Sequence, residues 1–217
     1  MKIVNFSETN SVMNRYLSEL RDTHIQTDPM RFRRNVERAG EIMAYEISKT
    51  LPYAPCRVKT RLGIATVQLP TLQPVVGTIL RAGLPLHQGM LNVFDRAENA
   101  FVSAYRVYSD EEHFEIHTEY IASPSLEGKT LILTDTMLAT GRSMEICYHA
   151  LLAKGCPATI HLVSVLASRQ AVEYIKQVFP AEKTTLWCGV IDPELNAHSY
   201  IVPGLGDAGD LCFGEKL

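Results

Sequence analysis

Apolar residues recur at helical spacing through residues 11–50, with one interruption at the segment TDPMRF, residues 27–32. Asp28 and Pro29 suit the start of a new helix, because aspartate caps free backbone N–H groups and proline is tolerated in the first turn. The pattern therefore predicts two helices. Apolar and polar residues then alternate along residues 57–69, which predicts a β-hairpin.

The rest of the chain alternates short apolar runs with helical patterns. Residues 74–94 are predicted to form a strand, a loop and a helix, and residues 100–123 a second hairpin or arm that turns at residues 109–113. Strands and helices then follow in turn: strand 130–135, helix 142–155 closed by Gly155, strand 158–168, helix 169–179 and strand 184–192. This order predicts an α/β fold with a mainly parallel central sheet flanked by helices and right-handed crossovers.

Composition restricts the class of protein. The 217 residues are 46% hydrophobic and carry no repeat or linker, so one domain over residues 1–217 is expected. A net charge of -3 argues against a nucleic-acid or membrane-surface binder, and any anionic ligand must be held locally.

Cysteine usage and the start of the chain indicate a compartment. The five cysteines are odd in number and lack a CxxC pair, and the seven histidines show no metal spacing. The cysteines are therefore expected to be reduced thiols, and neither disulfides nor a zinc site is predicted. The segment MKIVNFSETN does not resemble a leader, and no apolar run approaches about 18 residues, so a cytoplasmic protein is expected.

The segment TDTMLATGRSM, residues 134–144, places an acidic residue between a strand and a helix. A helix that begins near Gly141 directs free backbone N–H groups into the loop, and Thr140 and Ser143 add hydroxyl donors. A phosphate would fit these donors, whereas Asp135 would repel phosphate but could bind sugar hydroxyls or stabilise positive charge. A sugar phosphate would suit both the hydrogen-bond donors of the turn and the carboxylate of Asp135. The alternative is an ordinary capped helix with Asp135 as a turn residue.

Two arginines are candidates for further anion contacts. In TILRAGLPL, residues 78–86, Arg81 ends an apolar strand and Gly83 leaves the backbone open, so a cation and amides could hold a second anion. Arg81 could equally pair with a carboxylate, and Gly83 could simply permit a turn. Arg106 is either an exposed strand residue or a cation on a lid that closes over an anion.

Near the C-terminus, GLGDAG, residues 204–209, matches the dinucleotide fingerprint GxGxxG. Its context is wrong for that function, because Pro203 interrupts the approach and eight residues are too few for a crossover helix and a further strand. The glycines instead let backbone groups approach a flat ligand, and Asp207 adds a negative charge. A flexible tail is the alternative, but the apolar segments on either side favour anchoring to the core.

Taken together, ILRAG, TDTMLATGRS and YIVPGLGDAGD strongly resemble the uracil phosphoribosyltransferase family, in order and in spacing, and residues 27–46 resemble its N-terminal helical region. The resemblance implies a type I phosphoribosyltransferase-like fold with a β-hairpin arm and a C-terminal base-binding loop. It implies that uracil reacts with phosphoribosyl diphosphate (PRPP) to give UMP and diphosphate, with Mg²⁺ bound through PRPP near Asp207. It also implies a homodimer or larger homo-oligomer, without a nucleic-acid or membrane partner.

The resemblance assigns roles to individual residues. The catalytic residues would be Asp135, Arg81 and Arg106. Uracil would be bound by Ile201, Gly206, Asp207 and Ala208. PRPP would be bound by Arg81, Arg106, Asp135, Thr136, Met137, Leu138, Ala139, Thr140, Gly141, Arg142, Ser143 and Asp207.

The sequence departs from the family pattern at three positions: Thr136 replaces a proline, Arg142 a small residue and Leu211 a basic residue. These changes bear on efficiency and substrate preference more than on fold. Related enzymes often have a cis peptide bond in the loop after the equivalent of Arg81, here expected between Arg81 and Ala82. Two other functions stay open: a regulator of this fold that binds pyrimidine-operon RNA, and a phosphoribosyltransferase for another base.

Overall fold

The computed structural model describes residues 1–108 and 114–215, and side chains are described outside residues 104–118. Seven strands form one sheet in the order β1, β9, β8, β7, β4, β5 and β6. Neighbouring strands are parallel except for β5 and β6, which pair antiparallel. The strands are Lys2–Asn5 (β1), Val75–Ile79 (β4), Glu98–Tyr108 (β5), Phe114–Ala122 (β6), Thr130–Leu138 (β7), Thr159–Ser168 (β8) and Thr184–Asp192 (β9). The predicted mainly parallel sheet is confirmed.

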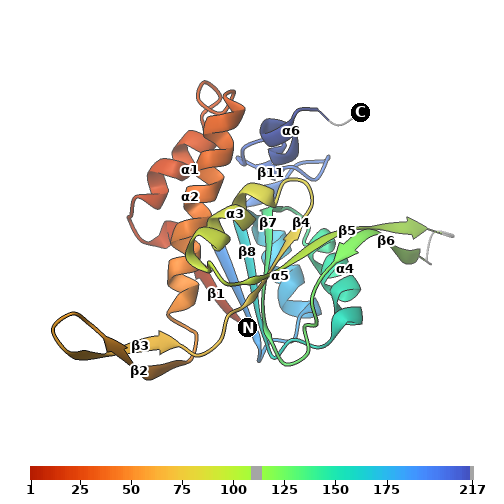
Figure 1. The fold of residues 1–217 in the computed structure, drawn as a ribbon. Coiled ribbons are helices and arrows are strands. Elements are labelled where there is room, and N and C mark those ends of the chain that lie inside the picture. Colours follow the sequence, from red (N-terminus) through yellow and green to blue (C-terminus); the bar gives the residue numbers. More distant parts are fainter. Residues whose placement is uncertain (109–113, 216–217) are drawn as a thin grey trace.

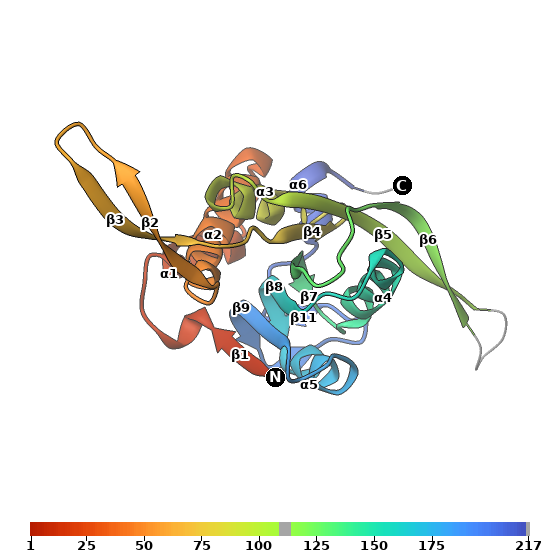
Figure 2. The same cartoon turned by 60° about the horizontal axis from the view of Figure 1, so that its bottom comes forward.

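Helices cover both faces of the sheet (Figures 1 and 2). One face packs against α1 (Met13–Arg21), α2 (Pro29–Ser48) and α3 (Leu84–Val93), and the other against α4 (Arg142–Leu151) and α5 (Arg169–Val178). Alternate residues of a strand serve opposite faces: Ile132 belongs to the first core cluster, whereas Leu131 and Leu133 belong to the second. The two faces explain why the strands read as continuous apolar runs.

The predicted elements near the N-terminus are present. Asp28 caps α2, since its carboxylate accepts hydrogen bonds from the backbone N–H groups of Met30 and Arg31, and Pro29 occupies the first turn. The first hairpin pairs β2 (Tyr53–Lys59) with β3 (Ile64–Pro70) and projects from the body (Figures 1 and 2). The second hairpin is β5 and β6, while its expected turn at residues 109–113 lies outside the described residues.

Two strand predictions need correction. Residues 2–5 were not expected to form a strand, yet β1 pairs in parallel with β9 along the edge of the sheet. The strand expected at residues 130–135 continues to Leu138, because β8 offers partners as far as Ala167, which pairs with Leu138. Asp135 therefore lies within β7, with three strand residues after it.

The C-terminal segment lies beside the carboxyl ends of the parallel strands (Figure 1). This segment forms a two-stranded piece, β10 (Glu194–Leu195) with β11 (Ile201–Val202), and a short helix α6 (Ala208–Phe213). Two 3₁₀ turns complete the secondary structure, η1 (Phe6–Glu8) and η2 (Leu152–Lys154). Ile201, Leu205, Ala208 and Cys212 are buried in the same core cluster as α1 to α3, which anchors the tail as its apolar segments predicted.

In the ranges 1–108 and 114–215, no helix combines the length and apolarity needed to cross a membrane.

A buried histidine should make stability depend on pH. His161 accepts a hydrogen bond from the indole N–H of Trp187 at 3.1 Å, and burial lowers the pKa of His161 to about 4 from an ordinary 6.5. The unfolded chain therefore binds the proton more readily, and stability present above pH 6.5 is lost as the pH falls toward 4, by up to about 3 kcal/mol. Denaturant unfolding of wild type and His161→Gln should show a smaller acid loss in the variant, and equal losses would contradict this.

Candidate active site

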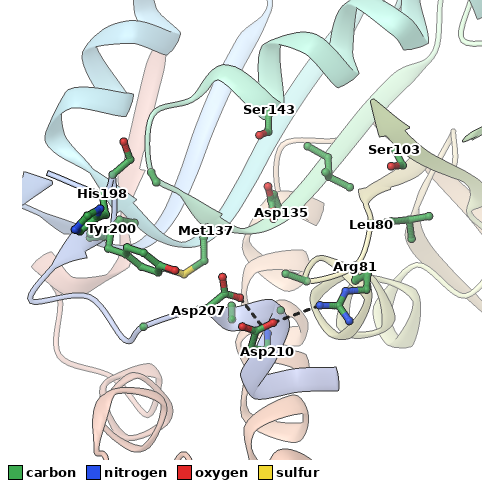
Figure 3. Close-up of a pocket in the computed structure, with 18 of the residues that line it drawn as sticks. Leu80, Arg81, Ser103, Asp135, Met137, Ser143, His198, Tyr200, Asp207 and Asp210 are labelled. Carbon is green, nitrogen blue, oxygen red and sulfur yellow. Dashed lines mark hydrogen bonds and ion pairs between the residues drawn. The ribbon is translucent and has the colours of Figure 1, made fainter. Parts of the chain in front are cut away.

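A cavity of about 830 Å³ opens at the carboxyl ends of β4 and β7 (Figure 3). Its walls come from the loop after β4, from β7 and the start of α4, from the bases of β5 and β6, and from the C-terminal segment. The lining residues are Ile79, Leu80, Arg81, Ala82, Ser103, Glu119, Tyr120, Asp135, Met137, Ala139, Ser143, His198, Ser199, Tyr200, Ile201, Gly206, Asp207, Ala208, Gly209 and Asp210. The three motifs of the sequence analysis thus meet in one cavity.

Asp135 lies half-buried in the wall formed by β7. Alternation along the strand turns Asp135 and Met137 toward the cavity, while Thr136 and Leu138 are buried on the other side. Burial raises the pKa of Asp135 to about 7 from 3.8, although hydrogen bonds from the backbone N–H groups of Met137 and Thr136 oppose the shift. The carboxyl can therefore change charge near neutral pH.

The turn from β7 into α4 builds an anion-binding corner. Gly141 takes φ 81° and precedes Arg142, the first residue of α4, as the sequence predicted. A Cβ at Gly141 would lie 2.9 Å from the ring of Tyr174, so both conformation and space require glycine. The N–H of Arg142 donates to the Thr140 hydroxyl at 3.4 Å. The N–H groups of the first turn carry the positive end of the helix dipole, and Ser143 from that turn lines the cavity.

Arg81 faces the C-terminal segment across the cavity mouth. Its guanidinium lies 3.4 Å from a carboxylate oxygen of Asp210 (Figure 3). It also lies 3.5 Å from the carbonyl oxygen of Gly214. The pair with Asp210 is half-exposed, so solvent screens it and an incoming anion can compete for the arginine. The cis peptide bond joins Leu80 to Arg81, one residue before the expected position, and the Arg81–Ala82 bond is trans.

A buried hydroxyl ties β7 to the Arg81 loop. Thr136 donates to the carbonyl oxygen of Ala82 at 2.6 Å, and its own carbonyl accepts from the hydroxyl of Ser164. The residue that follows Arg81 is therefore fixed to the strand that carries Asp135.

The C-terminal loop presents backbone and one carboxylate to the cavity. Ile201, Gly206 and Ala208 line it, and Asp207 caps α6 by accepting a hydrogen bond from the N–H of Asp210 at 3.0 Å. Figure 3 shows Asp207 on the opposite side of the cavity from Asp135 and Ser143. A flat ligand between these walls would meet main-chain groups on one side and the strand on the other.

Some expected residues lie elsewhere. Thr140 and Arg142 line a neighbouring cavity of about 740 Å³ against α5. Gly141 lies between them as the residue that precedes α4. Arg106 lies on β5 opposite Ile116, but its side chain is outside the described part of the chain. The sequence did not indicate Ser103, Glu119, His198, Tyr200 and Asp210, because no local pattern marks residues that approach a cavity from separate elements.

Carboxylates outnumber cations in the described lining of the cavity. Arg81 is accompanied by Glu119, Asp135, Asp207 and Asp210. Among the described residues, no three histidine, cysteine, aspartate or glutamate side chains are grouped closely enough to hold a metal ion. The described lining therefore offers a multiply charged anion little positive charge beyond Arg81.

The model of the uracil phosphoribosyltransferase family matches residues 7–215. The chain belongs to this family. It is 56% identical over 217 residues to a protein of Porphyromonas gingivalis named uracil phosphoribosyltransferase, with all of both chains covered. It is also 42% identical over 190 residues to the uracil phosphoribosyltransferase of Methanothermobacter thermautotrophicus, covering 87% of this chain and 86% of that protein.

Solved structures support the fold. A protein of Aquifex aeolicus superposes with a TM-score of 0.83 at 28% identity and 98% coverage of both chains. The orotate phosphoribosyltransferase of Mycobacterium tuberculosis, solved with PRPP, superposes with a TM-score of 0.53 at 14% identity, covering 87% of this chain and 94% of that one. The expected type I phosphoribosyltransferase fold is confirmed.

The three departures from the uracil phosphoribosyltransferase pattern have distinct surroundings. Thr136 makes the buried bond to Ala82, which a proline could not make. Arg142 is exposed at the start of α4, beside Thr140 in the neighbouring cavity. Leu211 packs against the core cluster under the tail, so an apolar contact stands where the resemblance leads one to expect a basic residue.

Proposed function

We propose that the chain transfers the phosphoribosyl group of PRPP to uracil, giving UMP and diphosphate. The observation that carries the proposal is the single cavity shared by Asp135, the N-terminus of α4 and the C-terminal loop. Family membership supports the same reaction. The lining draws residues from 79 through 210, so the whole chain is proposed to act as one domain.

The ribose 5′-phosphate is proposed to bind at the corner between β7 and α4. N–H groups of the first helical turn and the hydroxyls of Thr140 and Ser143 suit its charge. Asp135 then lies at the level of the ribose ring, where a carboxylate can accept hydrogen bonds from sugar hydroxyls. The remaining loop residues, Thr136, Met137, Leu138, Ala139, Gly141 and Arg142, are proposed to contribute mainly backbone and shape.

The reaction breaks the bond between ribose C1 and the diphosphate oxygen, and the oxygen keeps the electron pair. A ring nitrogen of uracil attacks the opposite face of C1, and the proton of this nitrogen passes to water. Positive charge develops on the sugar between these events, and ionised Asp135 is placed to stabilise it. Placement of the two substrates and exclusion of water supply the rest of the acceleration.

Uracil is proposed to bind against Ile201 and the backbone of Gly206, Asp207 and Ala208. Its edge offers an acceptor, a donor and an acceptor, which fixed main-chain groups can match. Cytosine reverses part of that pattern and would leave buried polar groups unpaired, which costs about 1–3 kcal/mol for each group. The base is thus selected with few side chains.

The leaving diphosphate is proposed to meet Arg81 and Arg106. Arg81 would exchange its half-exposed contact with Asp210 for phosphate oxygens, a stronger and geometrically better-matched partner. Mg²⁺ is proposed to enter with PRPP, since the described lining has more carboxylates than cations, and Asp207 offers an oxygen ligand at the cavity. When bound, the ion would neutralise charge on the diphosphate.

The test is incubation of the purified protein with PRPP, Mg²⁺ and a panel of bases, followed by separation of the nucleotides formed. UMP from uracil alone is the expected result. Product with another base instead would establish a different phosphoribosyltransferase. No product with any base, together with salt-sensitive binding of pyrimidine-operon RNA, would establish the regulator.

The Thr136 hydroxyl should contribute to PRPP binding through the Arg81 loop. Thr136→Val removes the bond to the Ala82 carbonyl and should lower the free energy of unfolding by about 1–3 kcal/mol. KM for PRPP should also rise severalfold. Thr134→Val is the matched control, because Thr134 donates to Gly77 deeper in the same strand at 3.0 Å. Equal KM values in the two variants would refute the link.

A homo-oligomer is also proposed, and the hairpin of β2 and β3 supports it. Pairing places Cys56 opposite Val67 and Val58 opposite Ala65 on one face, and that apolar face is exposed. The projecting hairpin could bury it only against another surface, for which a second copy of the chain is the proposed partner. Sedimentation of Val67→Lys should show a smaller species than Thr66→Lys, which alters the opposite face.

A cytoplasmic location remains part of the proposal. Cys56 and Cys156 are exposed thiols, which suits a reducing compartment. Cell fractionation would test it.

A further inference from the structure

The loop proposed to bind uracil is not held by long regular structure. Between Ile201 and Gly206, which both line the cavity, the chain leaves the two-residue strand β11 and turns at Gly204. Gly204 takes φ 58°, and a Cβ there would lie 2.0 Å from the carbonyl oxygen of Ile201. The turn is therefore tight, and its position depends on contacts from other elements.

Asp192 and Arg21 hold both polar backbone groups of Gly204. The carboxylate of Asp192, the last residue of β9, accepts the Gly204 N–H at 2.9 Å. Arg21, the last residue of α1, donates to the Gly204 carbonyl oxygen at 3.2 Å. The same guanidinium binds both carboxylate oxygens of Asp192, at 3.0 and 2.7 Å. One bidentate ion pair thus joins helix, sheet and loop.

The Arg21–Asp192 ion pair is buried enough to fix the position of the Gly204 turn. The Asp192 side chain is 6% exposed and the Arg21 side chain 23% exposed, so water screens the pair less than it screens the half-exposed Arg81–Asp210 contact. Neither Arg21 nor Asp192 lines the cavity. The hydrogen bonds of the pair to the loop reach Gly204, which lies between the cavity-lining residues Ile201 and Gly206.

We propose that Arg21 and Asp192 are positioning residues for the base-binding loop, which set the place of the uracil-facing backbone without touching substrate. The inference rests on the proposed function. Main-chain groups that match a base edge must lie at hydrogen-bond distance, and a displacement of about 1 Å can cost about a hundredfold in rate. The phosphate corner is formed by a different segment and does not depend on Gly204.

The experiment compares KM for uracil, KM for PRPP and kcat across matched variants. Arg21→Lys keeps the charge but loses the planar fork. The control is Arg31→Lys, because Arg31 makes an equally bidentate pair with Glu19, at 3.0 and 2.9 Å, between α1 and α2. Arg21→Lys should raise KM for uracil by about tenfold or more and KM for PRPP by less, since Asp207 is the one residue of this loop that is proposed to face PRPP, and the control should change neither.

Two further variants guard against a failure to fold. Asp192→Asn keeps an acceptor for the Gly204 N–H but removes the ion pair, and its KM for uracil should also rise. Arg21→Ala should regain a low KM for uracil when millimolar guanidinium is added, whereas Arg31→Ala should show no such response. Thermal denaturation identifies which variants are folded.

An unchanged KM for uracil in folded Arg21→Lys or Asp192→Asn would overturn the inference, as would an equal rise in both KM values. In either case UMP formation by the wild type would leave the proposed function intact. A wild-type protein that forms no UMP would refute the proposed function, and this inference with it.

Discussion

Replacing Asp135 with asparagine is expected to lower turnover by at least about tenfold, and by up to about a thousandfold on the scale of other lost electrostatic contacts. The substitution keeps the size of the side chain and removes its charge. Because the carboxyl lies in the cavity wall beside the proposed ribose position, the loss falls on the transition state. KM for PRPP should change less than kcat.

The pH dependence gives this prediction a second readout. The pKa of Asp135 is raised to about 7, so kcat/KM of the wild type should rise with pH through about 7 as the carboxylate forms. The asparagine variant should lack this limb. Steady-state rates between pH 5.5 and pH 8.5, roughly 1.5 units on either side, would show it.

Stability should move in the opposite direction to activity. The folded pKa of Asp135 lies above the ordinary value of 3.8, so the folded state binds the proton more tightly and the wild type loses stability as the pH rises from 3.8 to 7. Asp135→Asn avoids this loss. It should be more stable than wild type by about 1–4 kcal/mol at pH 8 and by almost nothing at pH 4. If wild type and Asp135→Asn have equal turnover in the kinetic measurement, Asp135 has no part in the mechanism.

Asp207 allows charge and helix capping to be separated. Asp207→Asn should lower kcat/KM for PRPP by more than about tenfold, because it removes the cavity-lining carboxylate that is proposed to face PRPP and its metal. Stability should be unchanged, since the amide oxygen of asparagine can still accept the N–H of Asp210 and cap α6. Steady-state kinetics with PRPP and Mg²⁺ varied separately would measure the effect.

Asp207→Ala is the comparison that distinguishes the two roles. It loses both charge and cap, so its activity should fall as in the asparagine variant, and its free energy of unfolding should fall by about 1 kcal/mol. If Asp207→Asn keeps full activity while Asp207→Ala loses it, the residue acts by holding α6 and not by its charge.

Local sequence determined the elements and the family. Helical spacing with Asp28 and Pro29 marked the start of α2, and the motif around residues 134–144 predicted a strand, an anion-binding turn and a helix. These features depend on neighbours a few residues apart, and that is the range over which hydrogen-bonding rules and side-chain periodicity act. The boundary after Asp135 was wrong because the strand continues only where β8 pairs with it.

Tertiary structure decided what depends on residues far apart in the chain. The raised pKa of Asp135 follows from burial by surrounding elements, and the contact of Arg81 with Asp210 joins segments 129 residues apart. The hydrogen bonds of Arg21 and Asp192 to Gly204 join α1 and β9 to the C-terminal segment. Periodicity along the chain carries no information on such meetings, because they arise only when the sheet order and the packing of α1 bring the segments together.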